Sequence, residues 1–299
     1  MKKIKKFILV FVVLMVINLV GCNSLNSKVE KYTIDKSGEQ SLNNIENIII
    51  EGYYLNINIF VSDKDTLSYK LSGDVNLNLT NNIEDKINII SYVKENDLMI
   101  TLNKDSDLKE YNSTNSLSLD IEIPKAYYKN LSISTSYSNI RVMGITVNEL
   151  VIDSNEGSMY IENSTSNNLV AILDRVDFIS DKVITSKSYM EMTKGNISLK
   201  DFNGNLEIYS REAEIDIQLG ESNDDIEIWN EKGEIDLYLP KEATFKLDAR
   251  TKNGYVKCEF PIPINEISSN EGLKGVVFDD SSSVIINNNE GNIKIMKKN

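Results

Sequence analysis

The chain has 299 residues and no histidine, which excludes metal sites built on imidazole and general-base catalysis by histidine. Its formal net charge of −13 makes nucleic acid a poor candidate partner, because phosphate binding needs a basic face. The hydrophobic content of 41% is enough for a buried core, and abundant β-branched residues with only 4 prolines favour strands over helices.

The first 22 residues predict a lipoprotein signal peptide. Lysines at positions 2, 3, 5 and 6 precede an apolar run, Phe7 to Val20, that is shorter than the ~20 residues needed to span a bilayer. The run ends in Leu19-Val20-Gly21-Cys22, which resembles the bacterial lipobox. This resemblance implies that Cys22 is lipidated and holds the protein at the outer face of the cell membrane through a polar tether, residues 23–30. The alternative is an uncleaved membrane anchor.

Residues 31–123 predict an N-terminal β region. Apolar residues alternate over stretches such as 55–61 and 117–123, which is typical of strands with one face in a core. These strands show no fixed repeat length. We expect a region that begins or caps the sheets of the following segment, with the boundary near Pro124.

Residues 124–299 contain a repeat. The phrase "EKGEIDLYLP" (231–240) has counterparts such as "TKGNISLKD" (193–201), and its glycine, or an equivalent residue, recurs every 18 to 21 residues. Apolar residues lie two and four places after this position and five and seven before it, so each unit holds two short strands. This pattern predicts an all-β fold, a β-solenoid of about 19-residue, two-strand coils stacked in chain order. The equivalent positions are Ser138, Gly157, Val176, Gly195, Ala213, Gly233, Gly254, Gly272 and Gly291.

Three features of the repeat lead to further expectations. The residue three places before the glycine is often small and polar, as in Thr135, Ser154 and Asn230, which predicts a hydrogen-bonded ladder along one edge. Residues 261–283 break the pattern, which indicates an excursion or a hairpin. Cys258, the single thiol left after removal of the signal peptide, occupies an inward position and is expected to be a buried structural thiol.

The repeat resembles the bacterial putative-adhesin family, whose domains contain tandem S-N-G-x-I-x-V strands. The resemblance rests on "IEIPKAYYKNLSISTSYSNIRV" (121–142), "TKGNISLKDFNGNLEI" (193–208) and "SSVIINNNEGNIKI" (282–295), and it extends over residues 45–297. It implies a β-solenoid on a secreted or membrane-anchored envelope protein. The family has no established catalytic residues, so none are implied here. The chain departs from the pattern where Ser138, Val176 and Ala213 replace the glycine.

No catalytic motif stands out in the sequence. A serine triad of the usual kind is impossible without histidine, and we expect no cofactor and no bound metal. Acidic residues recur on outward positions, in one column of Glu207, Glu227 and Asp248 and in another of Asp216 and Asp236. Because a straight column is a poor cage for calcium, we expect a solvated acidic face, and a site for a divalent cation or a cationic polymer is the alternative.

Tyr209 and Trp229 are the candidate binding residues. Both lie four places before the repeat position in consecutive units, so stacking would place them side by side on an outer face. Exposed neighbouring aromatic rings commonly form platforms for sugars or peptides. Cover by a loop, or ordinary strand propensity, is the alternative explanation.

Together these features predict a non-enzymatic, lipid-anchored cell-surface protein that acts as an adhesin-like interaction or envelope scaffold module. The expected partners are the membrane, through the lipid, and a surface or envelope protein or glycan. Two alternatives stay open. One is an accessory protein in envelope-stress sensing, and the other is a polysaccharide-acting β-helix enzyme, although narrow two-strand coils leave little room for a catalytic cleft.

Overall fold

The computed structural model describes residues 30–77, 87–104, 116–220, 224–262, 268–269 and 272–298, and every regular element in them is a strand. The all-β prediction is therefore confirmed. The predicted signal peptide, Cys22 and the first seven residues of the tether, 23–29, lie outside these ranges. Within the described ranges, no helix is long and apolar enough to cross a membrane.

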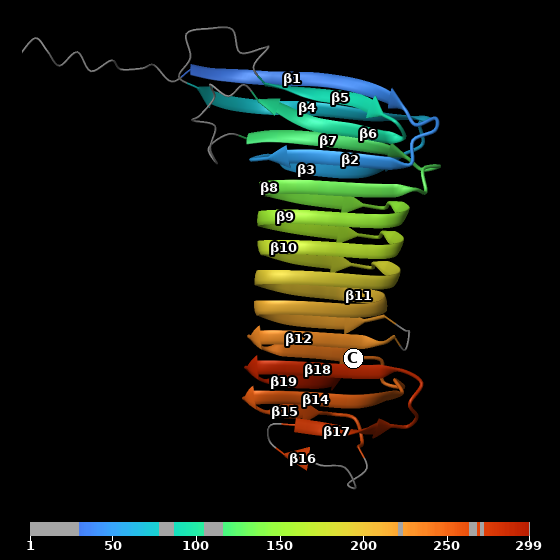
Figure 1. The fold of residues 1–299 in the computed structure, drawn as a ribbon, viewed down its shortest axis with the longest axis vertical. Coiled ribbons are helices and arrows are strands. Elements are labelled where there is room, and N and C mark those ends of the chain that lie inside the picture. Colours follow the sequence, from blue (N-terminus) through green and yellow to red (C-terminus); the bar gives the residue numbers. More distant parts are fainter. Residues whose placement is uncertain are drawn as a thin grey trace, which may run out of the picture.

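The middle of the molecule is a stack of long parallel strands, which Figure 1 shows as successive rungs. Pairing joins residues 19 apart in the chain, as Leu131 with Leu150 and Leu150 with Leu169. Each rung bends at a corner, so that its first half pairs in one column and its second half in another. We call these column A, which contains Leu131, and column B, which contains Ile140. The strands are β8 (Asn130–Met143), β9 (Thr146–Glu162), β10 (Thr165–Asp181) and β11 (Ile184–Leu219).

Apolar side chains at the predicted inward positions fill the space between the two columns. Ile215 pairs with Ile235 in column B, and both are buried. A single apolar cluster extends from Ile34 to Ile295, so the strands before and after Pro124 share one core. Burial of each such aliphatic side chain stabilises the fold by roughly 1.5–3 kcal/mol.

Glycine is required at several corners because the preceding rung approaches closely there. Gly233 has a φ of 135°, and a Cβ on it would lie 2.0 Å from the carbonyl oxygen of Ala213 in the preceding rung. Gly157 has the same relation to Ser138. The residues before Ser138 and Gly157, Tyr137 and Glu156, turn the chain alike, with φ of 55° and 59°. Glycine corners alternate with other residues from Ser138 to Gly233, and then Gly233, Gly291 and Gly254 follow one another in the stack.

The rungs near the C-terminus do not stack in chain order, and this part of the prediction is wrong. Ile226 of β12 (Ile226–Lys232) pairs with Val284, which in turn pairs with Leu247 of β14 (Phe245–Asn253). The final coil, β18 (Ser283–Glu290) and β19 (Ile293–Lys297), therefore lies between two coils that precede it in the sequence (Figure 1). The same order holds in column B, where β19 separates β13 (Ile235–Leu239) from β15 (Val256–Cys258).

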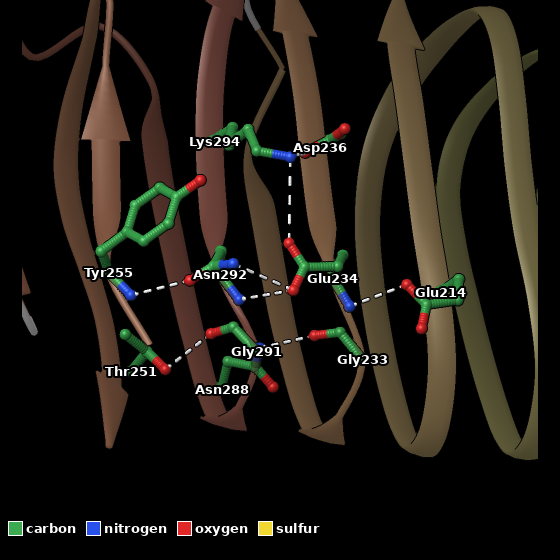
Figure 2. A network of polar contacts seen from close by, with 10 residues as sticks. All are labelled: Glu214, Gly233, Glu234, Asp236, Thr251, Tyr255, Asn288, Gly291, Asn292 and Lys294. Carbon is green, nitrogen blue, oxygen red and sulfur yellow. Dashed lines mark hydrogen bonds and ion pairs between the residues drawn. The ribbon is translucent and has the colours of Figure 1, made fainter. Parts of the chain in front are cut away.

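A polar network holds the inserted coil on both sides (Figure 2). The Glu234 carboxylate accepts hydrogen bonds from the backbone N–H and the side-chain Nδ2 of Asn292, at 3.2 and 3.1 Å. Asn292 Oδ1 in turn accepts the backbone N–H of Tyr255 at 3.1 Å. Lys294 adds an ion pair to Asp236 at 3.1 Å. The side chains of one rung thus satisfy backbone donors of the next.

Antiparallel strands extend both ends of the stack. At the N-terminal end, β2 (Asn47–Tyr53) and β3 (Asn56–Ser62) stack on β8, and β6 (Asp97–Lys104) and β7 (Ser116–Pro124) stack on β2 and β3. The remaining strands there pair antiparallel: β5 (Ile87–Lys94) with β6, β4 (Thr66–Leu77) with β7, and β1 (Glu30–Ser41) with β4.

At the other end, β17 (Gly272–Val277) pairs antiparallel with β14, and β16 (Ser268–Ser269) pairs antiparallel with β17. Of the two expectations for residues 261–283, an excursion or a hairpin, the structure therefore supports the hairpin.

The small polar residues form a ladder in two separate pieces. Thr135 and Ser154 are hydrogen-bonded at 3.1 Å, and Ser210 donates to Asn230 at 2.8 Å. The two rungs between these pairs place buried Leu173 and Met192 at the same position, so the ladder is interrupted.

Cys258 is partly exposed, because its strand, β15, lies at the edge of column B. The prediction of full burial is therefore wrong for this thiol, although Cys258 packs against the apolar core.

We predict that Gly233→Ala lowers the free energy of unfolding by roughly 2–4 kcal/mol, because alanine is strained at this φ and its methyl group meets the Ala213 carbonyl. Thermal and urea unfolding followed by circular dichroism measure the change. The matched control is Gly144→Ala, where φ is 70° and no atom lies within 4 Å of the added carbon, so the cost is about 1–2 kcal/mol. Equal losses in the two variants would contradict the close-approach argument.

We also predict that a chain ending at Ser282 keeps its rungs up to Leu239 but loses order in residues 245–277. In the whole protein, β14 lies two strand spacings from β12, and β18 fills the gap. Limited proteolysis with mass spectrometry should find cleavage within 245–277 and a protected core upstream. Protection of 245–277 in the shortened chain would show instead that β14 re-pairs directly with β12.

Candidate functional site

An open groove of about 1060 Å³ crosses the outer face of column A. Its floor comes from β11, β12, β18, β14 and β17, which pair in that order. The groove crosses six strand segments, because β11 contributes two, and at about 4.8 Å per strand this gives a length of roughly 24 Å. Its volume slightly exceeds the range of about 300–1,000 Å³ that is usual for small-molecule sites. The dimensions therefore suit an extended ligand.

Tyr209 and Trp229 lie side by side in this groove, directly paired on β11 and β12. Trp229 is 45% exposed, and Tyr209 is half-buried. They share a face because the alternation of a strand brings both to the outer side of column A. No other part of the described chain covers Trp229 with a stacked ring.

A glutamate two residues before each ring fixes its orientation. Tyr209 Oη donates to Glu207 Oε1 at 2.8 Å, and Trp229 Nε1 donates to Glu227 Oε1 at 2.7 Å. Residues two apart on a strand point to the same face, so the sequence pattern creates both pairs locally. The hydrogen bond to Glu207 raises the pKa of Tyr209 to about 12, so the phenol stays protonated at neutral pH. The polar atoms of both rings are thus occupied, while the ring of Trp229 stays exposed.

Tyr189 extends the aromatic surface and was missed in the sequence analysis. Its ring centroid lies 5.9 Å from that of Tyr209, and its hydroxyl donates to Glu191 at 3.3 Å. Tyr189 occupies the position six before the repeat glycine, whereas Tyr209 and Trp229 occupy the position four before. The alternation of tyrosine and glutamate along 189–191 was the available signal.

The other end of the groove is basic. Asp248 binds Arg250 through two hydrogen bonds, Nε to Oδ1 at 2.8 Å and Nη2 to Oδ2 at 2.9 Å, and it also pairs with Lys274 at 3.4 Å. Lys274 arrives on β17, in the segment that breaks the repeat. Sequence reasoning could not place Lys274 here, because its position depends on the antiparallel pairing of β17.

The inserted coil also changes the neighbours that the repeat predicted. Asn287 lies between Trp229 and Arg250, and Ile285 lies between Glu227 and Asp248. The expected continuous column of Glu207, Glu227 and Asp248 is therefore wrong, since only the two glutamates are adjacent. An apolar side chain relieves the charge repulsion that a third acid would add.

The second acidic column lies on the opposite face and is neutralised in part. Asp216 pairs in register with Asp236, which accepts Lys294 at 3.1 Å. Burial raises the pKa of Asp216. No group of three or more acidic, cysteine or histidine side chains is placed to hold a metal ion in the part of the chain that the structure describes.

Comparison with known proteins bears on the family and the fold. A family model described as Toastrack DUF4097 matches residues 45–296. No curated protein matches the chain.

Several solved structures resemble this one at low sequence identity. A putative adhesin from Bacteroides fragilis is 14% identical, with a TM-score of 0.50 over 89% of this chain and 97% of that one. A putative adhesin from Parabacteroides distasonis is 11% identical, with a TM-score of 0.41 over 90% and 98%. A putative cell adhesion protein from Clostridium sporogenes is 14% identical, with a TM-score of 0.33 over 89% and 100%. At these identities the likeness concerns the fold alone. Because the family model spans most of its length, the chain belongs to the Toastrack DUF4097 family.

Proposed function

We propose that this protein is a non-enzymatic, lipid-anchored cell-surface module that binds an extended envelope or matrix partner through the column A groove. The observation that carries the proposal is the open groove with the exposed ring of Trp229 on its floor. A groove of this length on a rigid stack offers many weak contacts to a polymer.

The position of the groove supports a role at a surface. The strands β1 and β5 lie at one end of the stack, and β12, β18, β14 and β17, which line the groove, lie toward the other end (Figure 1). Trp229 is eight strand steps from β5 in column A, which at about 4.8 Å per step is roughly 40 Å. An anchor at Cys22, a few residues before β1, would hold the β1 end close to the membrane. The groove would then lie on the side of the stack, well away from the anchored end and within reach of material beyond the lipid surface.

The groove favours binding over catalysis. Asp248 is engaged by Arg250 and Lys274, and Glu207 and Glu227 each accept a hydrogen bond from an aromatic ring. These carboxylates therefore already act as orienting groups for their neighbours. Two other outcomes would support the alternative functions. If the protein cleaved a glycan and a single point substitution abolished this activity, a polysaccharide-acting enzyme would be favoured. If the protein crosslinked to a single membrane protein in intact cells, a role as an accessory in envelope-stress sensing would be favoured.

The anchor has a direct test. Cells grown with a radioactive fatty acid should label the wild-type protein, and Cys22→Ala should abolish the label and release the protein from the membrane fraction. Cys258→Ser is the matched control and should keep the label. An unlabelled wild-type protein would refute lipid attachment.

The groove has an independent test. Trp229→Ala should weaken saturable binding of the protein to an envelope or matrix preparation by roughly tenfold or more, as loss of a central aromatic contact does. Tyr128→Ala removes an exposed ring from the turn between β7 and β8 and should leave binding unchanged. Equal binding by all three proteins would contradict the assignment of this groove as the binding surface.

A further inference from the structure

Toward β14 and β17 the groove carries charges of a sign that differs from that of the whole chain. This end contains three cations, Arg250, Lys252 and Lys274, against one acid, Asp248, whereas Arg211 lies at the aromatic end with Glu191, Glu231 and the two glutamates that orient the rings. The chain as a whole has a net charge of −13. The excess of cations at this end of the groove is therefore opposite in sign to the net charge of the chain.

Two cations of the groove are not engaged by a carboxylate in the described part of the chain. Arg211 and Lys252 make no ion pair within the described residues. Arg250 and Lys274 share a single carboxylate, that of Asp248, which leaves one positive charge in excess at that end. Guanidinium and ammonium groups that are not neutralised by a protein carboxylate can bind carboxylates or other anionic groups of a ligand.

The backbone geometry disfavours an extended peptide in this groove. Peptides that add to a sheet need an open edge with unpaired N–H and C=O groups. The floor strands β12, β18 and β14 each pair with a neighbour on both sides. Recognition must therefore come from side chains alone.

The side chains suit a sugar polymer. The C–H face of a pyranose ring is apolar and packs on an aromatic ring, and the ring of Trp229 is exposed and held in place by Glu227. Asn287, which pairs with Trp229, and Asn289 also line the groove, and their amides both donate to and accept from hydroxyl groups. Toward β17, Arg250, Lys252 and Lys274 supply the positive charge.

We propose that the groove binds an acidic polysaccharide, with a sugar ring over Trp229 and anionic groups toward Arg250, Lys252 and Lys274. This inference rests on the proposed function, because it names the ligand class of the same groove. Elsewhere the negative surface repels such a polymer, so the charge pattern directs it to this face.

Binding of the full mature protein to polygalacturonate, neutral dextran and poly-glutamate, measured by calorimetry at low and high salt, tests the proposal. We expect saturable binding to polygalacturonate that weakens as salt rises, and much weaker binding to dextran and to poly-glutamate. Trp229→Ala should reduce the affinity for polygalacturonate tenfold or more.

A charge-matched pair of variants separates local from general electrostatics. Lys252→Gln combined with Lys274→Gln should weaken binding to polygalacturonate and flatten its salt dependence, while Arg250 still neutralises Asp248. Lys241→Gln combined with Lys257→Gln removes the same charge outside the groove and should change neither.

Equal affinity for dextran and polygalacturonate would overturn the choice of an acidic ligand, and preference for poly-glutamate would overturn the choice of a glycan. If Trp229→Ala abolishes binding to surfaces but acidic glycans neither bind nor compete, this inference fails while the proposed function stands. If surface binding is independent of Trp229, both fail.

Discussion

The structure depends on main-chain hydrogen bonding between successive parallel rungs. These bonds fix neighbouring rungs at one strand spacing, so that residues in equivalent positions superpose along the stack. Superposition explains why Ile215 and Ile235 meet in the core and why Gly233 must leave its space to the Ala213 carbonyl. It also brings Tyr209 beside Trp229, although they are 20 positions apart in the chain. The core, the corners and the groove are therefore all consequences of the same register between successive rungs.

The sequence predicts the structure well wherever the register between rungs follows from the local repeat pattern. A two-residue period marks which side chains face the core, and the recurring glycine marks the corners, so the inward positions and the pairing of Tyr209 with Trp229 could be predicted. The ladder of small polar residues was only partly predictable. Leu173 and Met192 occupy two positions where a polar residue was expected, because an apolar side chain also packs well in the interior there.

The order of the last rungs could not be predicted for a physical reason. Any rung with the common pattern can pair with any other, so periodicity alone does not determine which rungs are neighbours. The specific information lies in side chains that bridge rungs. Asn292 joins Glu234 to the backbone of Tyr255, and Lys294 meets Asp236, which selects the final coil for that place (Figure 2). These contacts are 37 to 58 residues apart in the chain and have no periodic signature.

The insertion of the final coil determines the chemistry of the groove. Stacking in chain order would have placed Arg250 and Asp248 directly beside Trp229 and Glu227. Instead Asn287 and Ile285 separate them, which puts an amide and an apolar side chain between the aromatic end and the basic end. The two ends thereby keep different characters, with acids orienting the rings at one and cations outnumbering the single Asp248 at the other. A fold built on repetition acquires a non-repetitive surface because one coil lies out of chain order.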